Sequence, residues 1–99
     1  MIHHVVCFRF KPGTTPEAIA HATQAVLAMP KEIPYIRGIT FGPNLAPNAA
    51  EWSHVLLVRL DDMDAVNRYA ADPAHVRVVT EVLGPIREAR LAVDLEVPA

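Results

Sequence analysis

Histidine and tyrosine are the residues of this sequence that could carry acid–base chemistry. The 99 residues include five histidines and two tyrosines. An imidazole exchanges its proton near neutral pH, and a phenol donates a hydrogen bond to an oxygen on which negative charge develops. His4 and His54 are each the lone polar residue on an apolar face of a predicted strand, whereas Tyr69 and His75 flank an Asp72-Pro73 helix break.

These four side chains are expected to meet in one partly buried pocket, because a buried polar group without a partner costs roughly 1–3 kcal/mol. In a catalytic pocket, His75 is predicted to take a proton from a carbon beside a carbonyl group. Tyr69 is then predicted to hydrogen-bond the carbonyl oxygen. His4, His54 and Trp52, which shares a strand face with His54, are predicted to contact the substrate.

Two other interpretations of the histidines stay open from the sequence. The first is a hydrogen-bonded network inside a non-catalytic binding protein, and the second is a metal- or haem-dependent oxygenase. No carboxylate or thiolate is obviously placed to complete a metal shell. We therefore expect neither a metal ion nor another cofactor, since a carbonyl substrate supplies its own electron sink.

The composition excludes several classes of function. A formal net charge of −2, with 20% charged residues, lacks the basic surface of a nucleic-acid-binding protein. The single cysteine, Cys7, excludes an intramolecular disulfide and a multi-cysteine metal site. The hydrophobic share of 52% predicts a folded domain spanning 1–99. Neither a signal peptide nor an apolar run of roughly 18 residues is recognisable, so we expect a cytoplasmic protein without a membrane partner.

Apolar periodicity and helix-capping motifs predict an α+β fold. The expected elements are a strand at 2–10, a helix from Pro16 to about Met29, strands at 37–41 and 52–60, a helix capped within 61–64, a helix from Pro73 to the Gly84-Pro85 stop, and a strand at 89–97. This β-α-β-β-α-β order is ferredoxin-like and gives a four-stranded antiparallel sheet with helices on one face.

We expect the helices to cover only one of the two faces of this sheet. Between the helices and the sheet we expect the helix residues Leu27 and Val76 and the strand residues Leu91, Val93, Leu95 and Val97. Arg90, Asp94 and Glu96 of the last strand are predicted to point outward. The other face has no helical cover and carries Val5, Cys7, Val55 and Leu57. An apolar face of this kind predicts a homodimer formed through the sheet.

Four segments resemble the stress-responsive dimeric α/β-barrel (Dabb) family. They are HHVVCFRFK at the start, WSHVLLVRL, RYAADPAHVRVV and the terminal LAVDLEV, and together they cover nearly the whole chain. The most specific part is Tyr69, then Asp72-Pro73-Ala74-His75, a helix, and a strand with Asp94. The resemblance implies the split β-α-β-β-α-β fold and a homodimer in which two sheets meet as a barrel.

The resemblance also implies a class of chemistry. One plant branch of the family contains polyketide (olivetolic acid) cyclases, which close linear polyketides by an intramolecular aldol condensation without a cofactor. Its histidine base, upstream tyrosine and strand histidines match His75, Tyr69, His4 and His54. A small-molecule-binding protein, cyclase-like or isomerase-like if it is an enzyme, is therefore expected. Monooxygenases and haem-degrading enzymes share the fold and represent the oxygenase alternative.

Overall fold

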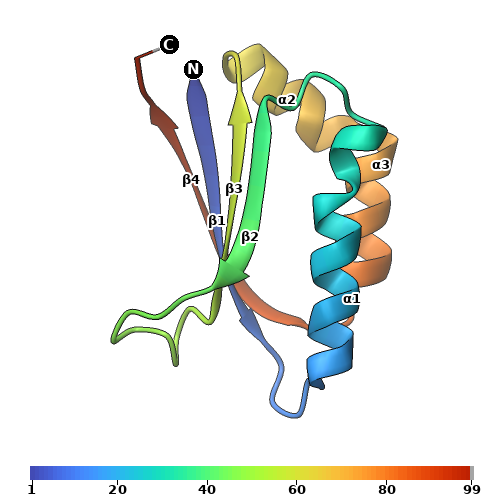
Figure 1. Ribbon diagram of the computed structural model, residues 1–99, viewed down its shortest axis with the longest axis vertical. Helices are drawn as coiled ribbons and strands as arrows, with labels where there is room; N and C mark the ends of the chain where they lie inside the picture. Colours follow the sequence, from blue (N-terminus) through green and yellow to red (C-terminus); the bar gives the residue numbers. More distant parts are fainter. Residues whose placement is uncertain (99) are drawn as a thin grey trace.

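The computed structural model describes residues 1–98 and has a four-stranded antiparallel sheet with its helices on one face (Figure 1). The elements are β1 (Ile2–Phe10), α1 (Pro16–Leu27), a 3₁₀ turn η1 (Met29–Lys31), β2 (Gly38–Pro43), β3 (His54–Leu60), α2 (Met63–Ala71), α3 (Pro73–Arg77), a π-helical turn η2 (Val78–Leu83) and β4 (Arg87–Glu96). The strands lie in the order β2-β3-β1-β4. This confirms the predicted ferredoxin-like fold.

Side-chain caps determine where the three α-helices begin. The Thr15 hydroxyl accepts from the Ala18 amide at 3.1 Å, and Pro16 occupies the first turn, where no amide hydrogen is needed. The Asp62 carboxylate accepts from the Ala65 amide at 2.8 Å and starts α2 in the same way. Within residues 1–98, no helix has the length and hydrophobicity that crossing a membrane requires.

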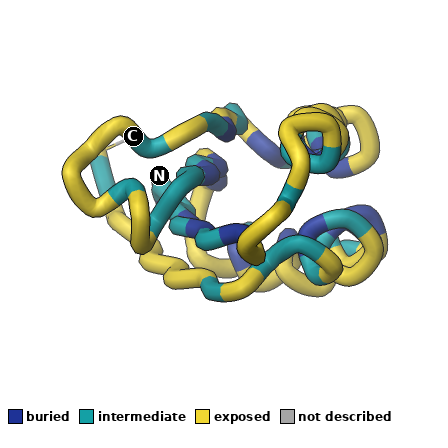
Figure 2. Tube along the Cα trace, turned by 90° about the horizontal axis from the view of Figure 1, so that it is seen from below, coloured by how far each residue is buried: buried dark blue, intermediate teal, exposed yellow. Residues whose placement is uncertain are grey.

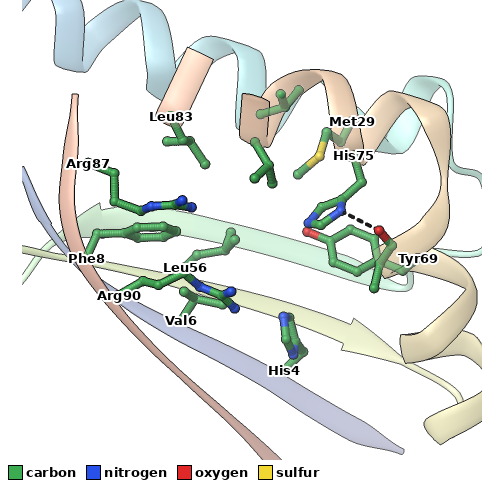
Figure 3. Close-up of a pocket in the computed structure, with 13 residues that line it drawn as sticks. His4, Val6, Phe8, Met29, Leu56, Tyr69, His75, Leu83, Arg87 and Arg90 are labelled. Atoms are coloured by element: carbon green, nitrogen blue, oxygen red, sulfur yellow. Dashed lines mark hydrogen bonds between the residues drawn. The ribbon is translucent and has the colours of Figure 1, made fainter. Parts of the chain in front are cut away.

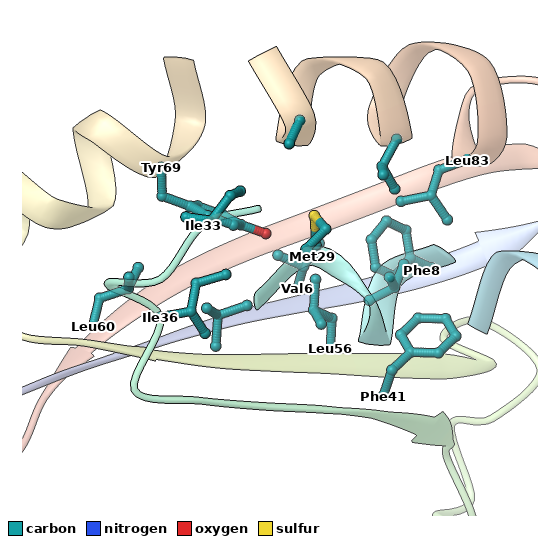
Figure 4. Close-up of a cluster of buried hydrophobic side chains, with 14 of the residues drawn as sticks. Val6, Phe8, Met29, Ile33, Ile36, Phe41, Leu56, Leu60, Tyr69 and Leu83 are labelled. Atoms are coloured by element: carbon teal, nitrogen blue, oxygen red, sulfur yellow. The ribbon is translucent and has the colours of Figure 1, made fainter. Parts of the chain in front are cut away.

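The core lies between the helices and the helix-facing side of the sheet (Figures 2 and 4). Strand pairing sets which side chains enter it, because directly paired residues share a face. Val6 pairs with Leu56 in the β1–β3 ladder, and both side chains are buried. Buried side chains from the helical layer, such as Val26 and Leu83, complete this core.

The orientation predicted for the last strand is wrong. Leu91 pairs with Cys7 and Val93 pairs with Val5, so the apolar side of β4 faces away from the helices. Leu91, Val93 and Leu95 are accordingly 48%, 51% and 55% exposed. Alternation shows which residues share a face of a strand, but it does not show which face the helices cover.

The uncovered side of the sheet therefore forms a continuous apolar surface, which we call the open sheet face. It comprises Val5 and Cys7 of β1, Val55 and Leu57 of β3, and Leu91, Val93 and Leu95 of β4. No helix of the described chain lies against it (Figure 1). The predicted parity of β1 and β3 is confirmed by the pairing of Val5 with Leu57 and Cys7 with Val55.

Two helical residues expected in the core are on the surface. Leu27 is 43% exposed and Val76 is 47% exposed. In the last helical segment, the chain passes from the short helix α3 into the wider turn η2. The buried side chains there are Val78 and Leu83 rather than those of a regular stripe through Val76, because a π-helical turn changes the angular spacing of its side chains.

Candidate functional site

A cavity of about 290 Å³ lies between the sheet and the α2–α3–η2 segment (Figure 3). Most of its lining is apolar, and its polar groups come from both layers. The lining residues are His4, Val6, Phe8, Met29, Leu56, Tyr69, Ala70, His75, Val78, Val79, Leu83, Arg87 and Arg90. The volume is at the lower end of the range of small-molecule sites, which begins at roughly 300 Å³.

The break between α2 and α3 brings Tyr69 and His75 together. Asp72 adopts an extended conformation (φ −63°, ψ 131°), and its carboxylate accepts from the Ala74 amide at 2.9 Å to start α3. The Asp72 amide still donates to the Tyr69 carbonyl at 3.1 Å, so the chain turns within one residue. As a result, the rings of Tyr69 and His75 lie 4.3 Å apart, centroid to centroid.

Tyr69 presents a buried hydroxyl that has no hydrogen-bond partner among residues 1–98. The residue is only 1% exposed, and its burial raises the pKa of the phenol well above its usual value. The hydroxyl therefore stays protonated at neutral pH and keeps its hydrogen for donation. An unsatisfied buried hydroxyl costs roughly 1–3 kcal/mol, which an oxygen acceptor in the cavity would offset.

His75 is held in one tautomer by the backbone. Its Nδ1 donates to the Ala70 carbonyl at 3.1 Å, and a carbonyl oxygen can only accept (Figure 3). The other ring nitrogen, Nε2, therefore carries the lone pair of the neutral ring. Burial lowers the pKa of His75; the hydrogen bond to Ala70 opposes this shift, and positive charge on His4 and Arg90 adds to it. His75 is thus a neutral imidazole at pH 7, ready to accept a proton at Nε2.

His4 enters the cavity from β1 and has a carboxylate partner on β4. Its Nδ1 donates to Asp94 Oδ1 at 2.6 Å, and its ring lies edge-on to Tyr69 with the centroids 5.8 Å apart. Asp94 faces the helices because it pairs with His4 across the ladder. The sequence prediction placed Asp94 on the outward side, and the inverted orientation of β4 corrects this.

The sequence did not single out Arg87, and it predicted that Arg90 points outward, but both arginines line the cavity. Three positions apart on a regular strand, they would face opposite sides of the sheet. An irregularity in the β1–β4 ladder changes this, since Arg90 pairs with Phe8 and Arg87 pairs with Phe10. Phe8 and Phe10 are both buried on the helix side. A bulge is not recognisable in the sequence, so this part of the site could not be read from alternation.

His54 does not join this cavity, contrary to prediction. Its ring lies 4.9 Å from that of Phe10 and 5.8 Å from that of Phe41, centroid to centroid. It faces the helical side as expected, but at the opposite end of the sheet from His4. Trp52 is also absent from the cavity lining. It precedes β3 in a loop, where its carbonyl accepts from the Asn44 side chain at 2.7 Å.

In residues 1–98, no three His, Cys, Asp or Glu side chains are grouped so that they could hold a metal ion. The polar groups of the cavity instead form an acid–base set. It contains a neutral imidazole base, a protonated phenol and a histidine fixed by a carboxylate. Such a set can take up a proton and donate a hydrogen bond to a developing oxyanion.

We expect the protein to become less stable as the pH falls from about 7.5 to about 5. Burial lowers the pKa values of His54 and His75 below the usual 6.5, so the unfolded chain binds more protons than the folded chain below that pH. The contribution of these two histidines to the free energy of unfolding is complete above about pH 6.5 and is lost on acidification. Urea unfolding at constant protein concentration, repeated across this range, measures the effect.

The control for this prediction is His54→Phe, which keeps an aromatic ring between Phe10 and Phe41 but does not titrate. This variant should show a shallower loss of unfolding free energy on acidification. Equal pH dependence in the variant and the wild type would contradict the role given to His54.

Comparison with family models places the chain in a known sequence family. The model described as the Stress responsive A/B Barrel Domain (Dabb) matches residues 2–97. No curated protein matches the sequence.

Solved structures with the same fold cover almost the entire chain. A dimeric protein of unknown function from Bacteroides fragilis has 30% sequence identity and a TM-score of 0.83, with 97% of this chain and 95% of that chain covered. A protein from Arabidopsis thaliana has 25% identity and a TM-score of 0.88, with coverage of 100% and 97%. A hydroxynitrile lyase from Passiflora edulis, at 14% identity, a TM-score of 0.84 and coverage of 98% and 93%, shows the shared fold alone.

Proposed function

This chain belongs to the stress-responsive A/B barrel domain family, and from that premise we propose that it binds a small, partly apolar carbonyl compound and moves a proton beside the carbonyl group. The observation that carries the proposal is the buried, unpartnered hydroxyl of Tyr69 next to the neutral imidazole of His75. Both side chains line one mainly apolar cavity.

The proposed step begins with His75 Nε2, which takes a proton from the carbon beside the carbonyl. The electrons of the broken C–H bond form a carbon–carbon double bond, and the carbonyl π electrons move to oxygen. Tyr69 donates a hydrogen bond to the resulting oxyanion, which lowers the energy of the transition state. The imidazolium then returns its proton to the same carbon, to another carbon, or to solvent.

Several reactions can follow this first step. Return of the proton elsewhere gives an isomerase, and attack of the enolate on a second carbonyl of the same molecule gives an aldol cyclase. The polyketide-cyclase type of reaction remains the finer proposal, and it requires the same proton transfer. His4, fixed by Asp94, is proposed to contact the bound molecule from the sheet side.

The experiment uses phenylacetone as a probe, in heavy water. Removal of a proton beside its carbonyl, followed by return of deuterium from solvent, erases the corresponding proton NMR signal. The proposal expects the protein to accelerate this loss above the buffer rate. A rate equal to that of buffer, at a phenylacetone concentration shown by protein NMR shifts to occupy the cavity, would reject a catalytic role.

Tyr69→Phe tests the oxyanion contact. The substitution removes one hydroxyl and keeps the ring against His75 and His4, so we expect the exchange rate to fall about 10²-fold, the scale for losing one oxyanion donor. Tyr35→Phe is the matched control, because its hydroxyl lies near Asp72 and outside the cavity. An exchange rate within twofold of wild type in Tyr69→Phe would exclude the contact.

We also propose that two copies of the chain associate through the open sheet face. This face is apolar, uncovered and contiguous across three strands. The Bacteroides fragilis protein of the same fold is described as dimeric. Association of this kind would leave the cavity accessible, because the cavity lies on the opposite side of the sheet.

A further inference from the structure

Two arginines occupy one side of the cavity, and we infer that they bind a carboxylate, so that the ligand is a small apolar carboxylic acid. This inference deepens the proposed function, on which it rests for the carbonyl group of the same molecule. Arg87 and Arg90 both line the cavity (Figure 3). Arg87 is half-buried and Arg90 is exposed, so their guanidinium groups are accessible from solvent.

The β-bulge gives the arginines a common direction. Arg90 is paired with Phe8, Ala89 with Arg9, and Arg87 with Phe10, so the ladder gains one residue at Glu88. This extra residue places both arginines on the helix-facing side, with the guanidinium groups beside the cavity. Bulges of this kind commonly redirect side chains next to active sites.

Both arginines lack an acidic partner within residues 1–98, and their nearest candidates are engaged elsewhere. Glu88 pairs with Arg9 on the other side of the sheet, at 2.8 Å. Asp94 pairs with His4 at 2.6 Å. By contrast, three other arginines of the described chain have carboxylate partners: Arg9, Arg37 and Arg77. Arg59 and Arg68 also lack a carboxylate, but Arg59 donates to the Arg37 carbonyl and Arg68 lies over the Tyr35 ring. Among the arginines of residues 1–98 without a carboxylate partner, Arg87 and Arg90 are those that line the cavity.

The arrangement specifies how such a ligand would lie. Its carboxylate would meet a guanidinium, whose planar fork of donors matches two carboxylate oxygens. Its apolar part would contact Phe8 and Leu83, and its carbonyl would reach Tyr69 and His75. Arg90 is close enough to lower the pKa values of both Tyr69 and His75, so a carboxylate there lies within the field of the acid–base pair.

Three probes with related carbon skeletons distinguish carboxylate binding at the arginines from ketone binding at Tyr69 and His75. Hydrocinnamate carries only the carboxylate, phenylacetone carries only the ketone, and phenylpyruvate carries both. Hydrocinnamamide is the uncharged counterpart of hydrocinnamate. Each is titrated into wild type, Arg90→Gln, Arg87→Gln and the double variant, and the affinity is measured from protein NMR shifts at fixed ionic strength.

We expect wild type to bind hydrocinnamate more tightly than hydrocinnamamide, and phenylpyruvate most tightly of all. Arg90→Gln should lower the affinity for hydrocinnamate at least tenfold, since charge-assisted hydrogen bonds to the carboxylate are lost. It should lower the affinity for phenylacetone less than twofold. Arg90→Lys should have an intermediate effect, because the charge remains without the fork. Raised salt should weaken the binding of hydrocinnamate and phenylpyruvate, which carry the carboxylate, and leave the binding of phenylacetone and hydrocinnamamide unchanged.

Arg68→Gln is the control for net charge, because Arg68 lies over the Tyr35 ring and outside the cavity lining. It should leave all four affinities unchanged. Equal affinity of the wild type for hydrocinnamate and hydrocinnamamide would overturn the carboxylate site. So would a double variant that loses equal affinity for hydrocinnamate and for phenylacetone.

These outcomes are distinguishable from failure of the proposed function. If the affinity for hydrocinnamate depends on Arg90 but the protein does not accelerate deuterium exchange of phenylacetone, the carboxylate site stands and the proton transfer is rejected. If the protein accelerates exchange but the affinity for hydrocinnamate depends on neither arginine, the proton transfer stands and the carboxylate site is rejected.

Discussion

Replacement of His75 by alanine is expected to reduce deuterium exchange of phenylacetone by about 10² to 10⁴-fold, toward the buffer rate. This is the usual contribution of a positioned general base. His75 is the base in the proposed step because Ala70 fixes its tautomer and burial lowers its pKa, which leaves Nε2 unprotonated at pH 7. The rate is measured by loss of the proton signal in heavy water.

His21→Ala is the matched control for this substitution. His21 is an exposed histidine on α1, outside the cavity lining, and its removal should leave exchange unchanged. The fold of His75→Ala is checked by its protein NMR spectrum, with His75→Gln as a second variant that fills more of the space. Wild-type exchange rates in a folded His75→Ala or His75→Gln protein would eliminate His75 as the base.

Leu57→Asp is expected to convert the proposed dimer into a monomer. Leu57 pairs with Val5 in the middle of the open sheet face, so a dimer through this face would bury the new carboxylate without a partner. An uncompensated buried charge costs about 3–5 kcal/mol, which corresponds to association weaker by roughly 10² to 4 × 10³-fold per site. Light scattering across a concentration series should change from the mass of two chains to the mass of one.

The same substitution in an exposed loop provides the control. Leu45 is 93% exposed and lies between β2 and β3, so Leu45→Asp should leave the mass unchanged. Val93→Asp tests the surface at a second, half-exposed position, where the isolated fold tolerates a charge. A dimer that persists in both Leu57→Asp and Val93→Asp would place the interface elsewhere.

The secondary structure could be predicted from the sequence because its signals are local. Thr15-Pro16 and Asp72-Pro73 cap helices through contacts within three residues, and the turn signals at the strand ends are equally local. The orientation of β4 depends instead on which face the helices cover. Apolar residues alternate along β4, which indicates that one side of the strand is apolar. The same alternation is expected whether that side faces the helices or belongs to the open sheet face.

The candidate site could be predicted only where position along the chain implied proximity in space. Tyr69 and His75 are linked by the break between α2 and α3. His4 lies on β1 and faces these helices. His54 has the same parity but pairs with Phe8, whereas His4 pairs with Val58. Phe8 still lines the cavity, so distance along the strand alone does not exclude His54. The His54 ring instead packs against Phe10 of β1 and Phe41 of β2, and parity along a strand does not show this packing.

The most direct test of the account is the pH profile of phenylacetone exchange by the wild-type protein. Because the base must be unprotonated, the protein-catalysed rate is predicted to rise with pH through a midpoint below 6.5 and to level off by neutral pH. The buffer rate, measured in parallel, is subtracted at each point. An absence of exchange above buffer at every pH, with phenylacetone bound in the cavity, would contradict the claim that Tyr69 and His75 move a proton.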